Sequence, residues 1–147
     1  NYTGIEINES FFEISNKKFG SYENFSVLNQ DFDSFLVDKG FDWVFASGFF
    51  SWKSENWDIQ TYGRIKKMLS ISNLGCVFNV LTGEPDSGML KRVDREIFIR
   101  EIVMPLSKDY QFFDNYLEGD LTVYLKSDPE YCGSCGCTPC DCGFGSY

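Results

Sequence analysis

The 147-residue sequence carries a formal net charge of −9 and no histidine, with 43% hydrophobic and 18% aromatic residues. These totals indicate one globular domain with a bulky core. They argue against a nucleic-acid partner, because phosphate binding relies on Lys and Arg, and the lack of histidine removes every Ser-His and Cys-His nucleophile arrangement. No apolar run approaches the roughly 20 residues of a membrane-spanning helix.

The cysteines are concentrated at one end of the chain. Cys76 stands alone in an apolar run, where it is expected to be a small buried hydrophobic residue. The other five fall within eleven residues, from Cys132 to Cys142. A domain held together by disulfides would distribute its cysteines through the fold, so we expect a cytoplasmic protein.

The first elements are predicted as strand, helix and strand. Residues 2–7 (YTGIEI) predict a strand, and Asn8 or Ser10 offers the N-cap of a helix that Gly20 ends. Residues 25–28 predict the second strand, which ends in the polar step Asn29-Gln30-Asp31.

The middle of the chain continues the alternation. Residues 41–46 (FDWVFA) predict a third strand that ends in Ser47-Gly48, and a helix is expected over 55–71. Residues 75–81 (GCVFNVL) are nearly continuous in apolar residues, which is typical of a strand buried on both faces. The turn-forming residues 82–88 predict a loop.

The last elements set the fold class. A helix is expected over 93–104, followed by strands at 111–117 and 121–126. Only three residues separate these two strands, and so short a gap joins only antiparallel neighbours. The earlier strands alternate with helices and should pair in parallel. The sequence therefore predicts an α/β, doubly wound, Rossmann-like sheet that is mostly parallel, with an antiparallel C-terminal hairpin.

Four segments in this order resemble the class I (Rossmann-like) S-adenosylmethionine-dependent methyltransferases. Residues 2–7 are similar to that family's second strand, which ends in an acidic residue. Residues 29–32 are similar to the polar and acidic step after its third strand. Residues 41–50 are similar to the fourth strand and its loop, and residues 117–126 to the closing hairpin. The likeness spans residues 2–126.

The resemblance implies a binding site for S-adenosylmethionine. Glu6, with Ile7 beside it, would accept hydrogen bonds from the ribose hydroxyls, since a carboxylate has two forked acceptor oxygens. Asp31 would accept from the adenine amino group and Phe32 would wall the ring. Ser47-Gly48 would let the backbone pass close to the cofactor.

Each of these residues also has a structural interpretation. Glu6 is equally an N-terminal charge that favours the dipole of the next helix. Asp31 and Phe32 also fit a solvated turn followed by a core residue, and Gly48 fits a plain strand-ending turn. The sequence leaves these alternatives open.

The chain departs from the family at its start. Only five residues precede Glu6, so the family's first strand and glycine loop are absent from this sequence. In the family that strand lies at the centre of the sheet, and its absence would leave two open strand edges. We therefore expect an N-terminally incomplete methyltransferase-like domain over residues 1–127, followed by a flexible Gly/Cys-rich tail over 128–147.

The tail has the pattern C-x2-C-x-C-x2-C-x-C, formed by Cys132, Cys135, Cys137, Cys140 and Cys142. The first four could supply a tetrahedral thiolate site for zinc. Zinc ribbons hold their cysteine pairs further apart, and a flexible tail with incidental or redox-active thiols is the alternative.

The function that the resemblance implies is methyl transfer from S-adenosylmethionine to a small-molecule or protein acceptor. No catalytic residue is nominated, because the sulfonium is already activated. The loop 47–50 (SGFF) lacks the prolines of the family members that methylate DNA bases. A non-catalytic α/β binding module on the same scaffold is the alternative, and the closing hairpin argues against a nicotinamide-dependent oxidoreductase.

Overall fold

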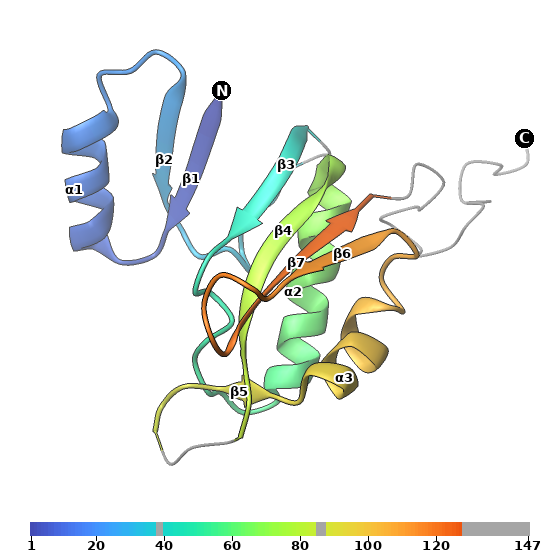
Figure 1. The fold of residues 1–147 in the computed structure, drawn as a ribbon. Helices are drawn as coiled ribbons and strands as arrows, with labels where there is room; N and C mark the ends of the chain where they lie inside the picture. Colours follow the sequence, from blue (N-terminus) through green and yellow to red (C-terminus); the bar gives the residue numbers. More distant parts are fainter. Residues whose placement is uncertain (38–39, 85–87, 128–147) are drawn as a thin grey trace, which may run out of the picture. The chain divides into compact units, whose positions relative to one another are not determined.

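The structure is a computed structural model that describes residues 1–37, 40–84 and 88–127 (Figure 1). The chain divides into two compact units, Asn1–Val37 and Asp38–Tyr147. We call them the N-terminal unit and the C-terminal unit, and each is described by itself. The two units hold separate sheets, one of two strands and one of five.

The N-terminal unit is a β-α-β segment. Strand β1 (Tyr2–Glu6) and strand β2 (Phe25–Asn29) pair in parallel, and α1 (Glu9–Phe19) connects them. The side chain of Asn8 caps α1 by accepting from the amide of Phe11 at 3.2 Å, as the N-cap preference predicts. The helix ends before Gly20, so the predicted bounds of all three elements are confirmed to within a residue.

Aromatic rings join the two strands and the helix of the N-terminal unit. Tyr2 and Phe25, which are opposite each other in the register, stack with centroids 5.3 Å apart, and Phe19 of α1 lies 5.5 Å from Phe25. All residues of α1 are described and none of their side chains is buried. This unit therefore holds together by a thin aromatic contact and leaves much apolar surface exposed.

The C-terminal unit contains a mixed sheet in the order β3-β4-β7-β6. Strand β3 (Phe41–Ala46) pairs in parallel with β4 (Ser72–Thr82), and β4 and β6 (Tyr110–Phe113) both pair antiparallel with β7 (Asp120–Lys126). The short β5 (Arg92–Val93) pairs in parallel with the end of β4. The predicted parallel strands and antiparallel closing pair are confirmed.

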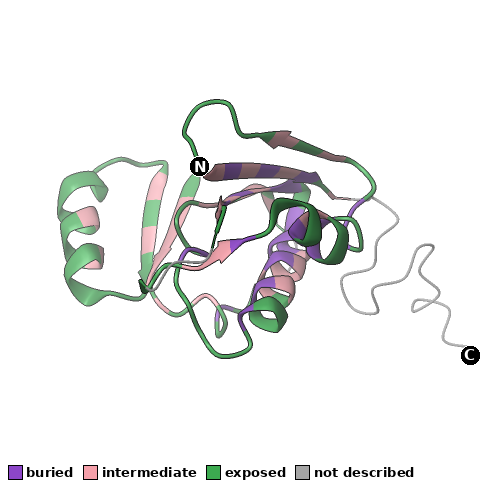
Figure 2. Cartoon of the chain, turned by 60° about the horizontal axis from the view of Figure 1, so that its bottom comes forward, coloured by how far each residue is buried: buried purple, intermediate pink, exposed green. Residues whose placement is uncertain are grey.

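One face of this sheet forms the core. Helix α2 (Trp57–Ile71) and helix α3 (Arg95–Phe98), followed by the π-helix η1 (Ile99–Val103), supply the covering side chains (Figure 2). Phe78 of β4 contacts Phe98 of α3 edge-on at 6.4 Å and the loop residue Phe50 at 5.4 Å. The buried apolar side chains that alternate along β4 and β7 point to this face: Cys76, Phe78, Val80, Leu121, Val123 and Leu125.

The opposite face of the sheet is only partly covered. Val77 and Tyr124 are half-buried, and Phe45 is 70% exposed. Trp43 lies against Tyr124 with centroids 5.0 Å apart. The prediction that β4 is buried on both faces is therefore wrong for the described part of the chain, because helices pack on one side of it.

Two predicted elements near the end of the chain have other bounds. The expected helix over 93–104 is split into α3, capped by Asp94, and η1, whose wider turn lets the amide of Met104 reach the carbonyl of Ile99 at 2.9 Å. The expected strand over 111–117 ends at Phe113, and residues 114–119 form a loop. The carboxylate of Asp114, the first residue after β6, pairs with Arg95 at 3.2 Å.

Candidate functional site

The carboxyl ends of β1 and β2 meet at one edge of the N-terminal unit. Glu6 is opposite Asn29 in the register, and the side-chain amide of Asn29 donates to the carbonyls of Glu6 (2.9 Å) and Ile7 (3.4 Å). The amide of Gln30 donates to the carbonyl of Glu6 at 3.2 Å. These bonds fix the chain immediately after both strands.

The Glu6 carboxylate also serves the turn that leads into α1. Its Oε1 accepts from the amide of Asn8 at 2.7 Å, and the side chain remains half-exposed. The structural role that the sequence suggested for Glu6 at the start of the helix is thus present. A carboxylate has about four lone-pair positions, so this single bond is compatible with a ligand on the same group.

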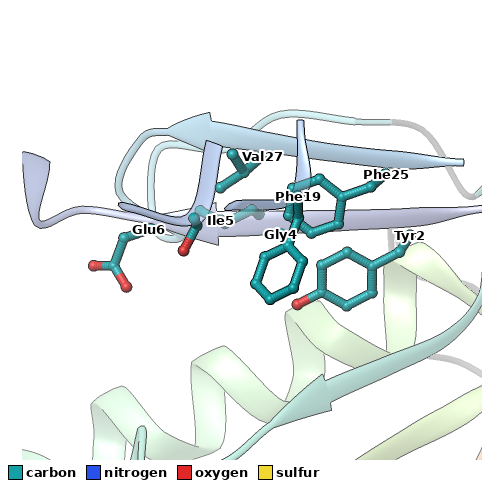
Figure 3. A pocket seen from close by; sticks show the side chains of 8 residues that line it. Tyr2, Gly4, Ile5, Glu6, Phe19, Phe25 and Val27 are labelled. Atoms are coloured by element: carbon teal, nitrogen blue, oxygen red, sulfur yellow. The ribbon is translucent and has the colours of Figure 1, made fainter. Parts of the chain in front are cut away.

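A hollow of about 410 Å³ extends along β1 from this carboxylate. Figure 3 shows the rings of Tyr2, Phe19 and Phe25 gathered at one end and the Glu6 carboxylate at the other. Gly4 lies between them and presents no side chain. The hollow is therefore apolar and aromatic with one charged end.

Asp31 lies two residues after the end of β2 and is exposed, and Phe32 next to it is half-buried. The Oδ1 of Asp31 accepts from the amide of Asp33 at 2.9 Å, and its carbonyl accepts from the hydroxyl of Ser34 at 3.0 Å. The turn that the alternative interpretation expected is present, and it engages one of the two carboxylate oxygens.

Ser47 and Gly48 lie at the exit of β3 in the C-terminal unit. Both are exposed, and Gly48 has a left-handed backbone with φ of +69° and no atom within 4 Å of a Cβ built there. Its amide donates to Oδ1 of Asn79 in β4 at 2.7 Å. The glycine is thus required by the backbone conformation rather than by crowding.

Asn79 belongs to a hydrogen-bond network that the sequence analysis missed. Its Nδ2 donates to both carboxylate oxygens of Asp120, at 3.1 and 3.0 Å, and Tyr116 donates to Oδ1 of Asp120 at 2.7 Å. The hydroxyls of Tyr116 and Thr122 are also 2.7 Å apart. The signal in the sequence is Asn79 itself, a polar side chain inside an apolar strand.

The loops after β3 and β4 are joined side by side. Trp52 and Leu90 form an antiparallel bridge, with the amide of Lys53 donating to the carbonyl of Met89 at 3.0 Å. Trp52 is 58% exposed and Met89 is 73% exposed. Four aromatic residues lie in the loop after β3 or at the start of α2. Phe50 and Trp57 are buried, whereas Phe49 and Trp52 are exposed.

Metal ligation and membrane insertion find no support in the described residues. Among residues 1–37, 40–84 and 88–127, no group of three or more His, Cys, Asp or Glu side chains could hold a metal ion. The predicted zinc ligands Cys132, Cys135, Cys137 and Cys140 lie outside the described residues. The helices of the described segments are too short or too polar to cross a bilayer.

Comparison with known proteins gives matches in structure alone. No protein-family model and no curated protein matches the sequence. The magnesium protoporphyrin IX methyltransferase of Synechocystis, solved with S-adenosylhomocysteine, matches with a TM-score of 0.60 and 10% identity over 86% of this chain and 63% of its own. The N-methyltransferase NodS of Bradyrhizobium japonicum matches with 0.57 and 12% over 85% and 72%.

Other matches are similar in quality and differ in the length they span. A methyltransferase of Methanosarcina mazei matches with a TM-score of 0.58 and 12% identity over 86% of this chain and 81% of its own. The chain covers only 52% of a matched protein from Bordetella parapertussis, so it spans between half and two thirds of the longer matches. The chain has the α/β fold with a mixed sheet that these methyltransferases share.

Proposed function

We propose that the chain is part of an S-adenosylmethionine-dependent methyltransferase that acts in the cytoplasm on a small-molecule or protein acceptor. The observation that carries the proposal is the edge at which the parallel strands β1 and β2 end, with Glu6 as the last residue of β1 and Asp31 two residues after the end of β2. In open α/β sheets, ligands bind beyond the carboxyl ends of the strands. The matched methyltransferases with bound S-adenosylhomocysteine support the same ligand class.

Each proposed binding residue has a stated task. Glu6, with Ile7 beside it, would take the ribose hydroxyls through the carboxylate oxygen that the Asn8 amide leaves unused. Asp31 would take the adenine amino group and Phe32 the face of the ring. The left-handed Gly48 with Ser47 would let the backbone pass close to the cofactor.

Methyl transfer itself requires little acid–base chemistry from the protein. The sulfonium carbon is activated by the cofactor, so the protein must hold the nucleophile, the methyl carbon and sulfur in line and exclude water. The exposed Trp52 and Met89, on the joined loops after β3 and β4, form an apolar rim suited to an acceptor with an apolar portion.

We further propose that a strand and glycine loop from outside this sequence pair with an open strand edge. In the described part of the chain, β1 pairs only with β2 and β3 pairs only with β4. Each therefore has one edge that no described strand pairs with, and folded proteins seldom leave such an edge open. The greater length of several matched methyltransferases supports an additional segment.

Calorimetric titration of the full-length protein with S-adenosylhomocysteine tests the proposal. Glu6→Gln keeps the bond to the Asn8 amide but removes the charge and one acceptor. A hydrogen bond to a charged group contributes about 1.5–3 kcal/mol, so we expect the Kd to rise by about tenfold or more.

Glu9→Gln is the matched control. Glu9 is exposed in the first turn of α1, and the substitution removes the same charge three residues away. We expect its Kd to stay within about twofold of the unmodified protein, as for a surface substitution. If the unmodified protein releases no binding heat, the result favours the non-catalytic module instead. If both variants lose affinity equally, Glu6 is not part of the binding site.

A further inference from the structure

Two segments far apart in the sequence meet at the side chain of Asn79. The exit of β3 contributes the Gly48 amide and the first residue of β7 contributes the Asp120 carboxylate, which Tyr116 in the loop before β7 contacts in turn. The Asn79 side chain is half-buried on the face of β4 opposite the helices. It connects Ser47-Gly48, which we call the proposed cofactor loop, to the closing hairpin of the sheet.

The orientation of the Asn79 amide follows from its partners. The Gly48 N–H can only donate, so the oxygen of Asn79 must face it. The Nδ2 group then faces Asp120, whose two oxygens lie 3.1 and 3.0 Å away and can only accept while ionised. Both ends of the side chain are thus satisfied in one orientation only.

Tyr116 closes the network on the outer side. Its hydroxyl has one hydrogen, which goes to Asp120, so it accepts from Thr122. The pKa of Tyr116 is raised by desolvation and, against the opposing hydrogen bond with Thr122, by the Asp120 carboxylate. The hydroxyl therefore remains a donor at neutral pH and helps to keep Asp120 in place.

The contact to Asn79 determines the direction of one peptide group. No atom lies within 4 Å of a Cβ built on Gly48, so crowding does not hold its left-handed conformation. The peptide plane is rigid and trans. With the Gly48 N–H directed at β4, the Ser47 carbonyl of the same plane must point away from β4.

We propose that Asn79 is a positioning residue that acts through the Gly48 amide, and that Asp120, with Tyr116, fixes the Asn79 amide for this task. The network presets the backbone of the proposed cofactor loop before ligand arrives, which reduces the ordering cost of binding. The inference rests on the proposed function for its ligand, whereas the coupling among these residues rests on the hydrogen bonds alone.

The test exchanges the two polar groups. In Asn79→Asp, two carboxylates face each other. In the double variant Asn79→Asp, Asp120→Asn, the carboxylate at position 79 accepts from the Gly48 amide, and the side-chain amide at position 120 donates to that carboxylate. At pH 8 we expect the Kd for S-adenosylhomocysteine to rise about tenfold or more in the single variant. The double variant should return to within about threefold of the unmodified protein, because neighbouring substitutions couple.

The pH dependence supplies a readout that a merely structural defect would not produce. One of two facing carboxyls has a raised pKa, so the Kd of Asn79→Asp should fall as the pH falls from 8 to 5.5. The Kd of the double variant should show the same pH dependence as that of the unmodified protein. Asn73→Asp is the charge control, since Asn73 is exposed on the same strand. Its Kd should change by less than about twofold.

The chemical shift of the Gly48 amide proton, measured by NMR, reports the coupling without ligand. It should move in Asn79→Asp and return in the double variant. Tyr116→Phe, at an exposed position, should raise the Kd about two- to threefold even if the single variant at 79 folds poorly. A double variant no better than Asn79→Asp, or an Asn79→Asp Kd equal to that of the unmodified protein, overturns the inference. Absence of binding by the unmodified protein overturns the proposed function instead.

Discussion

Gly75 illustrates how one residue in a strand can decide stability. It lies in β4 with φ of +153°, and a Cβ added there would meet the carbonyl oxygen of Leu125 and lie 2.7 Å from the Trp43 ring. Trp43 is itself held against Tyr124. Because neither the backbone nor the packed ring can give way, we expect Gly75→Ala to lower the free energy of unfolding by about 2–4 kcal/mol in urea denaturation.

Gly63 provides the matched control for this prediction. It lies in the interior of α2, is exposed, and has no atom within 4 Å of an added Cβ. Gly63→Ala should therefore raise the free energy of unfolding by about 0.5–1 kcal/mol, because alanine is the better helix former. If Gly75→Ala also raised the free energy of unfolding, backbone propensity rather than the clash with β7 would explain both changes.

Cys76 is a buried thiol in the middle of β4, as the sequence predicted. Burial of the thiol raises its pKa to about 12. As the pH rises, the thiol therefore loses its proton in the unfolded chain before it does so in the folded protein. The stability that depends on the protonated thiol is complete below about pH 9 and declines as the pH rises towards 12. Urea denaturation from pH 8 to 11 should show this loss.

The control for the thiol is Cys76→Ala, which should lack the part of the pH dependence that Cys76 contributes. Alkylation offers a second measurement, since only the thiolate reacts. At pH 8, iodoacetamide should modify Cys76 only when the protein is unfolded, as peptide mass spectrometry would show. Rapid labelling of Cys76 in the native protein would contradict the assignment.

At the level of elements, the local signals for strands and helices were sufficient over most of the chain. The apolar run of β3, the N-cap of α1 and the helical period of α2 depend on residues close in sequence, and these elements lie where predicted. The strand predicted over 111–117 ends at Phe113, and Asp114 just beyond it pairs with Arg95, a contact across 19 residues. Such a partner leaves no local pattern.

The same distinction separates the parts of the candidate site. Glu6 and the polar step after β2 could be placed from sequence because residues after parallel strands gather at one edge. The Asn79 network could not, since its partners lie 31 residues before it, at Gly48, and 41 residues after it, at Asp120. The apolar run around Asn79 predicted burial on both faces, which hid the open face that this side chain occupies.

At the level of the whole molecule, the two units differ in how much of their apolar surface they bury. The C-terminal unit has a core in which several strand and helix residues are fully buried, including Ile65, Phe78 and Val123. In α1 of the N-terminal unit, Phe11 and Ile14 are each 60% exposed. Since burial of apolar area is the main stabilising contribution, the units should differ in local stability.

Hydrogen exchange measured by mass spectrometry tests this difference in the chain of 147 residues. The amides of β4 and β7, which pair with each other over seven residues, should exchange most slowly. Those of β1 and β2 should exchange at least about 100-fold faster, because their opening exposes little additional apolar surface. Equal protection of both sheets would contradict the burial pattern. If a strand from outside this sequence pairs with β1, the second edge of β1 would no longer be open. The protection of the β1 amides should then increase more in the longer protein than that of any other strand.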